Sequence, residues 1–158
     1  MPTTGHSGAR AAARKTTVFA LFCGVALAAA VGSPGQQGSS DAAEIGRMLR
    51  DASRAIQAGN AASFLGYFDK DEFAGFAALR ENVVALTGQR QIASSIEITG
   101  LTGGENGYRV GVSWLLQLTY TGDPGAVETR QEAVTCAVKE IGGKWKVVQL
   151  EPVSLFRP

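Results

Sequence analysis

The sequence predicts an α+β fold in which three N-terminal helices pack on a strongly curved antiparallel sheet of about four strands. The first observation is a change of period. Apolar residues recur at helical spacing up to Gly88 and at every second position from Ile92 onward. The second observation is that glycine-containing turn stretches separate the alternating segments, as in antiparallel sheets. Helices that precede the strands, rather than alternate with them, are typical of the α+β class.

Size and charge restrict the kinds of protein that this chain can be. It has 158 residues, 45% of them hydrophobic, and a net charge of +1, which suits one globular domain. Basic residues do not cluster beyond the first fifteen positions, so no nucleic-acid partner is expected. The sequence has no phosphate-binding glycine loop and no cluster of metal ligands, so we expect no cofactor and no metal.

Residues 1–32 have the organisation of a secretory signal peptide. Basic residues within 10–15 precede an apolar run at 18–31, which is the order of regions in such signals. The run is shorter than the about 20 residues of a membrane span. We therefore expect export to the periplasm or the extracellular space, with an uncleaved N-terminal membrane anchor as the alternative. The small and polar stretch 33–40 is expected to be a flexible linker, and 41–158 the folded domain.

Cleavage of this signal would leave a mature chain with one cysteine, Cys136, and without His6, the only histidine. A single cysteine excludes an internal disulfide. A domain without histidine cannot use a Ser-His-Asp or Cys-His mechanism, and it lacks the most common transition-metal ligand. Cys136 lies between Val134 and Val138 on one strand face, so it is expected to be a small buried hydrophobic residue.

Three helices are expected between Asp41 and Gly88. Asp41, Asn60 and Asp71 are placed to cap their N-termini. Gly59 and Gly88 are placed to end the first and the third helix. The apolar positions are Ile45, Met48, Leu49, Ala52 and Ile56 in the first helix, Phe64, Leu65 and Phe68 beside the second, and Phe73, Phe76, Val83, Val84 and Leu86 in the third.

Alternating residues then predict the strands. The first strand covers 91–99, and a turn-rich loop at 100–107 leads to the clearest strand, 108–120. One face of that strand is expected to lie on the core: Tyr108, Val110, Val112, Trp114, Leu116, Leu118 and Tyr120. A last strand, KWKVVQL, follows a turn at Gly142-Gly143, and its register stays open because both of its faces carry apolar residues.

The turn after the long strand is expected at residues 123–125, Asp-Pro-Gly. Proline suits the second position of a type I turn, and glycine suits the left-handed position that follows. This turn would place Trp114 opposite Val134 and Leu116 opposite Glu132. Trp114 and Val134 would then face the helices together, since a pairing shifted by one residue would lose the apolar match.

Three segments resemble the nuclear transport factor 2-like superfamily, whose cystatin-like cones include polyketide cyclases, ketosteroid isomerase-like and SnoaL-like proteins. They are the helical pattern AIQAGNAASFLGYFD, the strand YRVGVSWLLQL and the ending GGKWKVVQLEPVSLF. The resemblance covers about residues 41–158. It implies N-terminal helices that cover a strongly curved sheet, and it identifies element order rather than a catalytic motif.

The superfamily contains isomerases, dehydratases, epoxide hydrolases, polyketide cyclases and members without known activity, so the resemblance alone implies no reaction. Its steroid-isomerase-like members present an aspartate from a short strand after the second helix. Here FDKDEFAGFAALRENV passes from Asp69 directly into a helical pattern. No residue can be assigned as the counterpart of that aspartate, which counts against an enzyme.

Charges alternate on the inner face of the strand after the Asp-Pro-Gly turn. Glu128, Arg130 and Glu132 form either a solvated strand end with weak ion pairs or the polar rim of an apolar pocket. In an enzyme, the catalytic residues would be Glu132 as a base, Arg130 to orient the substrate and Tyr120 as a hydrogen-bond donor. Burial beside Leu116 and Val134 would raise the pKa of Glu132 toward a working range.

The ligand pocket predicted in this way would use mostly apolar side chains. The ligand-binding candidates are Trp114, Leu116, Leu118, Glu128, Tyr67 and Phe68. The alternative is that these rings simply pack in the core. No metal is expected among them.

The outer face of the sheet carries a flat, uncharged stripe. Its residues are Leu115, Gln117, Gln131, Ala133 and Thr135. Absence of charge on an exposed face suits a partner surface, here a homodimer interface. An ordinary threonine-rich solvent face is the alternative, because threonine favours strands in any case.

These patterns favour an exported, non-catalytic domain that binds a small apolar ligand or another protein. One alternative is a pocket enzyme of the isomerase, dehydratase or cyclase type that acts on a small apolar substrate. The other is an assembly domain held at the membrane by an uncleaved N-terminus.

Overall fold

A computed structural model describes residues 34–158, so the signal or anchor predicted at 1–32 lies outside the described residues. None of the helices within 34–158 combines the length and apolarity needed to span a membrane. The elements are α1 (Pro34–Gln57), α2 (Ala61–Leu65), α3 (Phe76–Gln89), β1 (Arg90–Gly104), β2 (Gly107–Tyr120), β3 (Asp123–Ile141), β4 (Lys144–Glu151) and the 3-10 turn η1 (Val153–Phe156).

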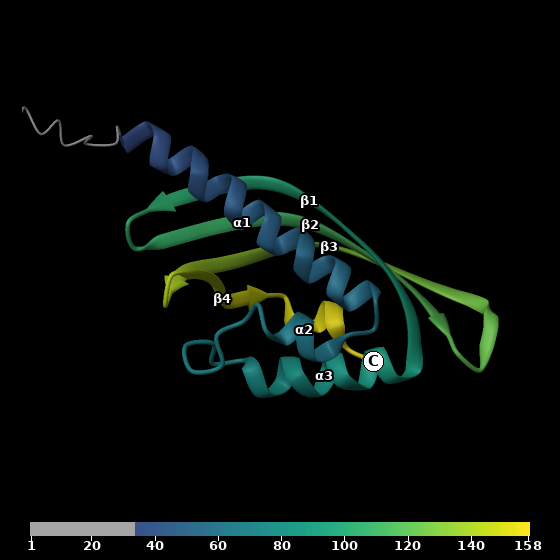
Figure 1. The fold of residues 1–158 in the computed structure, drawn as a ribbon. Coiled ribbons are helices and arrows are strands. Elements are labelled where there is room, and N and C mark those ends of the chain that lie inside the picture. Colours follow the sequence, from purple (N-terminus) through teal and green to yellow (C-terminus); the bar gives the residue numbers. More distant parts are fainter. Residues whose placement is uncertain (1–33) are drawn as a thin grey trace, which may run out of the picture. The chain divides into compact units, whose positions relative to one another are not determined.

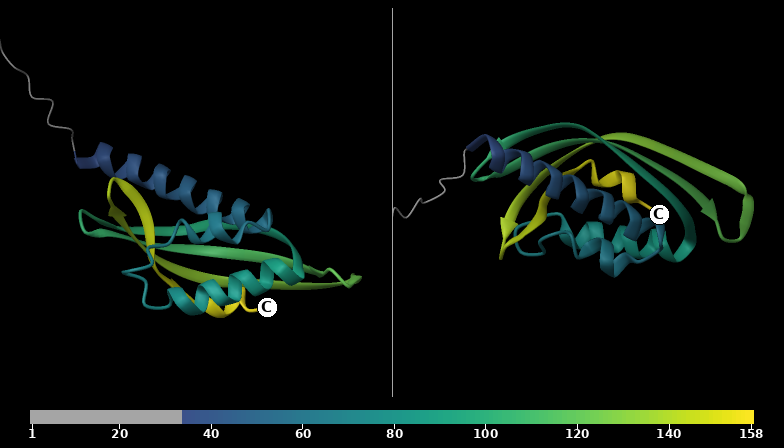
Figure 2. Two further views of the ribbon diagram at one scale, coloured as in Figure 1. Left: turned by 60° about the horizontal axis from the view of Figure 1, so that its bottom comes forward. Right: turned by 45° about the horizontal axis from the view of Figure 1, so that its top comes forward.

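The four strands form one antiparallel sheet in the order β1-β2-β3-β4. The sheet arches over the helices, which lie on its inner, concave side (Figure 1). Two further views show α1 and α3 apart, with α2 between them (Figure 2). The α+β class, the three helices and the curved four-stranded sheet are therefore confirmed.

β2 buries one face almost completely. Six of the seven residues expected on the core are buried: Tyr108, Val110, Val112, Trp114, Leu116 and Leu118. Tyr120, the seventh, lies where the β2–β3 end of the sheet projects beyond the helices (Figure 1), and it is 44% exposed. Alternation of apolar and polar residues therefore identified the face correctly, because side chains of a strand point to opposite sides in turn.

The register of the β2–β3 pair differs from the prediction by two residues. Trp114 lies opposite Glu132, and Val112 lies opposite Val134. The turn forms earlier than predicted, at residues 121–122, and pairs Tyr120 with Asp123. A bulge then leaves residues 124–126 without partners on β2. A shift of two preserves the face of every side chain, so Trp114 and Val134 are still both buried on the inner side.

The N-terminal side of α1 corrects two expectations. Residues 34–40 are helical rather than a flexible linker, since α1 begins at Pro34. Proline is well tolerated in the first turn of a helix, where its missing N–H would have no partner. Asp41 consequently lies inside α1 and is not its cap.

The other helix starts are partly as expected. Asn60 caps α2, because its Oδ1 accepts a hydrogen bond from the backbone N–H of Ser63 at 2.9 Å. Asp71 does not cap α3, which begins at Phe76 without a side-chain cap. Val84, expected in the core, is 53% exposed on α3.

Asp69 organises the turn between α2 and α3. Its Oδ1 accepts hydrogen bonds from the backbone N–H groups of Glu72 at 2.8 Å and Asp71 at 2.9 Å. These two hydrogen bonds lower the pKa of Asp69, because they stabilise the charged carboxylate. Asp69 thus stabilises the turn that precedes α3, whereas α3 itself has no side-chain cap.

The β1–β2 and β3–β4 hairpins depend on glycine. The expected loop at 100–107 is mostly strand, with a turn of only two residues, Glu105 and Asn106. Gly107 follows this turn with φ of 112°, and a Cβ there would lie 2.5 Å from the carbonyl oxygen of Val138. The predicted Gly142-Gly143 turn is confirmed, and both of its residues have positive φ.

Cys136 is predicted to be inert in the folded protein. It is buried, and burial raises the pKa of its thiol to about 12. In a Cys23→Ser variant, which leaves Cys136 as the only thiol, we expect no reaction with a disulfide reagent at pH 8 until denaturant unfolds the chain. Rapid modification without denaturant would contradict the buried position.

Candidate functional site

The inner side of the sheet is filled by the chain's own aromatic rings. The Phe156 ring lies 5.2 Å from Trp114 and 5.3 Å from Phe64, measured between ring centroids. Phe68 continues the cluster at 5.0 Å from Phe64. Trp114, Leu116 and Leu118, predicted to contact a ligand, are 0% exposed. They are packed core residues, as the alternative interpretation expected.

The tryptophan N–H at the centre of this cluster also has a partner within the protein. Nε1 of Trp114 donates a hydrogen bond to Oγ of Ser94 at 3.0 Å. Oγ of Ser94 is in turn 2.8 Å from Oγ of Ser53, a buried residue of α1. This chain of hydrogen bonds satisfies polar groups that burial would otherwise penalise. It joins α1, β1 and β2 rather than offering a donor to a ligand.

The C-terminal turn closes the inner side, and sequence reasoning missed it. After β4, η1 brings Leu155 and Phe156 under the sheet, where they are 2% and 0% exposed. The available signal was the apolar pair Leu155-Phe156 soon after Pro152, since apolar residues so close to the end of the last strand need a core to bury them.

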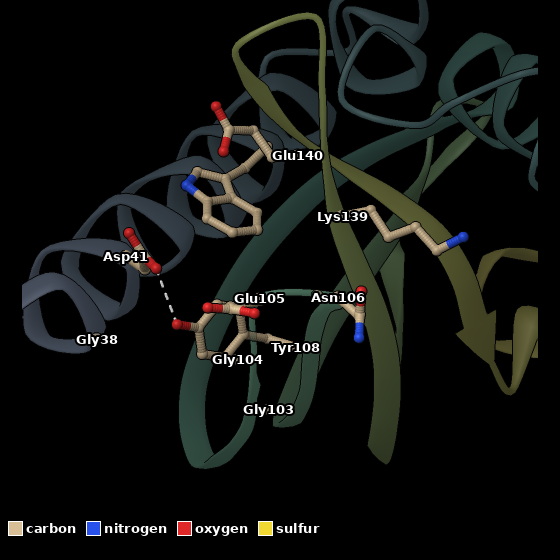
Figure 3. A pocket seen from close by; sticks show the side chains of 11 residues that line it. Gly38, Asp41, Gly103, Gly104, Glu105, Asn106, Tyr108, Lys139 and Glu140 are labelled. Carbon is tan, nitrogen blue, oxygen red and sulfur yellow. Dashed lines mark hydrogen bonds between the residues drawn. The ribbon is translucent and has the colours of Figure 1, made fainter. Parts of the chain in front are cut away.

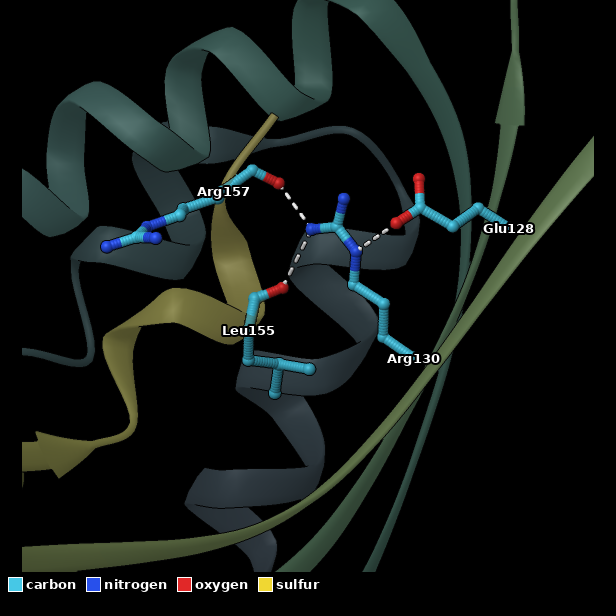
Figure 4. Close-up of polar contacts among 4 residues, drawn as sticks. All are labelled: Glu128, Arg130, Leu155 and Arg157. Carbon is cyan, nitrogen blue, oxygen red and sulfur yellow. Dashed lines mark hydrogen bonds and ion pairs between the residues drawn. The ribbon is translucent and has the colours of Figure 1, made fainter.

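Arg130 holds this turn in place. Its Nη1 donates hydrogen bonds to the carbonyl oxygens of Leu155, at 3.2 Å, and of Arg157 (Figure 4). Its Nε donates to Oε1 of Glu128 at 2.7 Å. This contact with Arg130 lowers the pKa of Glu128. The structure therefore brings Glu128 and Arg130 together, but Arg130 binds the chain's own C-terminal segment.

Glu132 and Tyr120 lie elsewhere. Glu132 is exposed, so the expected burial beside Leu116 and Val134 is wrong. The cause is that β4 pairs only from Thr135 to Ile141 of β3, which leaves the preceding part of β3 as a sheet edge. The ring of Tyr120 lies 4.7 Å from the guanidinium carbon of Arg90, in a cation–π contact. Within residues 34–158, neither residue makes a hydrogen bond or an ion pair with Arg130.

A hollow remains at the opposite end of the inner face, beside the β1–β2 turn (Figure 3). This hairpin cavity has a volume of about 620 Å³ and is lined by Gly38, Asp41, Gly103, Gly104, Glu105, Asn106, Gly107, Tyr108, Lys139, Glu140 and Trp145. Oδ2 of Asp41 accepts a hydrogen bond from the Tyr108 hydroxyl at 2.8 Å. That hydrogen bond raises the pKa of Tyr108, because it favours the protonated phenol.

A second cavity shares Trp145 with the first. This helix-side cavity has a volume of about 640 Å³, and Tyr67, one of the predicted ligand-contacting residues, lines it. Phe68, the next residue, is buried instead and pairs with Val147 through a single parallel bridge. Trp145, on the strand whose register the sequence left open, is half-buried. No local pattern around Trp145 indicates that a hollow forms on either side of it.

Metal binding has no support in the described part of the chain. Within residues 34–158, no three histidine, cysteine, aspartate or glutamate side chains lie together as a metal ion would require.

This chain is similar to known proteins in its three-dimensional structure but not detectably in its sequence. No protein-family model matches the sequence, and no curated protein matches it significantly. A solved structure from Novosphingobium aromaticivorans, proposed to be a scytalone dehydratase, has a TM-score of 0.65 and 17% identity, covering 73% of this chain and 85% of that chain. A protein of unknown function from Mycobacterium tuberculosis has a TM-score of 0.62 and 13% identity, covering 75% of this chain and 73% of that chain.

A third structure connects the fold to its class by name. It is a nuclear transport factor 2-like protein with a cystatin-like fold, also from N. aromaticivorans. Its TM-score is 0.57 and its identity 15%, and the match covers 73% of this chain and 82% of that chain. The chain thus has the cystatin-like fold of nuclear transport factor 2-like proteins. At these identities the likeness defines the fold and leaves the activity open.

Proposed function

We propose that this chain is an exported, non-catalytic binding domain that acts through the outer face of its sheet. The observation that carries the proposal is the packing of Trp114 and Phe156, both 0% exposed, where the sequence predicted an apolar ligand pocket. A general base must reach its substrate within hydrogen-bond distance, and Glu132 is on an exposed sheet edge. Export rests on the signal-like residues 1–32.

The pocket enzyme is the weaker candidate for the same reasons. One structural neighbour is proposed to be a scytalone dehydratase. That likeness would favour a dehydratase here only if the predicted catalytic residues of this chain lay together. In this chain Arg130 is engaged by Glu128 and the C-terminal turn, and the ring of Tyr120 contacts Arg90. The anchored assembly domain differs from our proposal only in residues 1–32, and N-terminal sequencing of the exported protein distinguishes the two.

The outer face supports a partner surface, and we propose a second copy of this chain as its occupant. Its residues alternate with the buried side chains of β2 and β3, and none carries a charge: Leu115, Gln117, Gln131, Ala133 and Thr135. Leu115 lies opposite Gln131 in the sheet, and Thr135 lies between Gly111 of β2 and Glu151 of β4, so the uncharged stripe is bordered by a carboxylate on the β4 side. A two-fold dimer brings one patch against itself, which an uncharged patch permits without repulsion between like charges.

Thr135→Arg is expected to convert a dimer into a monomer. The substitution would add a positive charge to the proposed interface from each copy, and like charges that meet in an interface cost several kcal/mol. Light scattering after gel filtration measures the mass. Val84→Arg, which adds the same charge at an exposed position of α3, is the matched control and should stay dimeric. The proposal is wrong if the wild-type chain is already a monomer, or if the Thr135→Arg variant has the same mass as the wild type.

A further inference from the structure

The hairpin cavity has an aromatic wall that the protein does not fill. Tyr108 and Trp145 meet edge to face, with ring centroids 5.5 Å apart and planes at 71°. Tyr108 is buried and fixed by Asp41, whereas Trp145 is half-buried and opens to the hollow. Within residues 34–158, the indole N–H of Trp145 donates no hydrogen bond. A large apolar ring that lines a cavity of about 620 Å³ offers the surface on which a ligand can stack.

The other walls give this hollow a negative charge. Carboxylates enter its lining from three elements: Asp41 from α1, Glu105 from the β1–β2 turn and Glu140 from β3 (Figure 3). The one basic residue of the lining, Lys139, is committed elsewhere, because its Nζ lies 2.6 Å from a carboxylate oxygen of Glu72. Neither Glu105 nor Glu140 has a salt-bridge partner in the described chain.

The neighbouring helix-side cavity provides a contrast within the same molecule. It shares Trp145 but is lined by Arg47, Lys144 and Lys146 alongside Glu44 and Asp51. A cation is therefore favoured on one side of Trp145 only, and the difference comes from side-chain charge rather than from the aromatic surface.

The spread of the carboxylates decides what kind of cation fits. They do not converge as a metal site requires, so a small ion could contact only part of the set. An aliphatic chain that carries several ammonium groups could place one group near each carboxylate and lay its methylene groups on the indole. Ammonium groups are also attracted to the faces of tryptophan and tyrosine rings.

We propose that the hairpin cavity binds an aliphatic polyamine, with its ammonium groups beside Asp41, Glu105 and Glu140 and its chain against Trp145. The site is separate from the outer sheet face, so it does not depend on the proposed dimer. A neutral sugar is the competing ligand, because sugars also stack on tryptophan. The uncompensated carboxylates favour the cation.

Spermidine titration of the full chain tests this proposal. The chain has two tryptophans, and Trp114 is 0% exposed, so a change in emission on saturation reports on Trp145. Calorimetry gives the affinity independently of fluorescence. We expect Glu140→Gln, an exposed substitution that leaves the core intact, to weaken spermidine binding about five-fold. Trp145→Ala should weaken it about ten-fold, and the fluorescence response should vanish in Trp145→Phe.

Matched controls separate this site from general attraction of a polyamine to acidic groups. Glu44→Gln removes one exposed carboxylate from the helix-side cavity and should leave the affinity unchanged. Magnesium and trehalose should compete weakly or not at all. The proposal is overturned if spermidine shows no saturable binding, if Glu44→Gln weakens binding as much as Glu140→Gln, or if trehalose binds and spermidine does not. Circular dichroism verifies that each variant is folded.

Discussion

Phe156→Ala is expected to lower the free energy of unfolding by about 3–5 kcal/mol. The Phe156 ring is 0% exposed and contacts Trp114 and Phe64 at the centre of the aromatic cluster. Removing it leaves a cavity under the sheet whose walls, packed on other core residues, can collapse only in part. The loss therefore combines the lost burial of the ring with the cost of the cavity.

Urea denaturation of the wild type and of two variants measures this loss. Phe156→Leu keeps most of the volume and should cost clearly less than Phe156→Ala. Val127→Ala removes apolar atoms from a residue that is 58% exposed, so it should change stability by no more than about 0.5 kcal/mol. If Phe156→Ala costs less than about 1 kcal/mol, the C-terminal turn is not part of the core and the filled interior is incorrect.

The fold was predictable wherever one periodic signal dominated. On β2, six inward residues were identified because a strand that faces water on one side must alternate. The register of β2 and β3 was harder to predict, because a shift of two residues keeps every apolar side chain on the same face. Trp114 lies opposite Glu132 instead of Val134, yet it is still buried in the core. Only the turn distinguishes the two registers, and here Asp123 pairs with Tyr120 while Pro124 and Gly125 lie in a bulge instead of forming the turn.

The candidate site was less predictable because burial depends on elements distant in sequence. The exposure of Glu132 follows from the short pairing of β4, which starts opposite Thr135, and no local feature of β3 encodes it. Trp145 lies on a strand with apolar residues on both faces, so its sequence pattern does not decide whether it is buried. It lines two hollows because α1 and the β1–β2 turn leave space beside it. The distance between these elements cannot be deduced from the alternation of residues along one strand.

The alternating charges of β3 now have a physical role. An uncovered sheet edge presents unpaired backbone groups that can recruit another strand, and charged side chains there oppose such pairing. Glu128, Arg130 and Glu132 lie on the part of β3 that β4 does not cover. Glu128 and Arg130 also form an ion pair, which holds these two charged side chains in place at the edge.

Arg130→Met is expected to destabilise the protein by about 2 kcal/mol, because it retains an apolar stem but removes the guanidinium. The carbonyl oxygens of Leu155 and Arg157 would lose a charged donor, and hydrogen bonds to charged groups contribute about 1.5–3 kcal/mol. The ion pair with Glu128 adds at most about 1 kcal/mol, since the Glu128 side chain is 46% exposed. Arg130→Lys should recover part of the loss, because a single ammonium group cannot reach all three partners.

The pH dependence of this loss identifies the part that comes from Glu128. Its pKa is lowered from 4.5 in the folded chain, so its contribution is present above pH 4.5 and is lost as the pH falls through the lowered pKa. The stability difference between wild type and Arg130→Met should therefore shrink at acidic pH but not reach zero, because the two carbonyl contacts do not titrate. In a Glu128→Gln background, Arg130→Met should still lower stability through the two carbonyl contacts, but the size of that loss should no longer depend on pH. A difference that stays constant on acidification would show that Glu128 and Arg130 do not interact in solution, and a difference near zero at neutral pH would show that Arg130 does not hold the C-terminal turn.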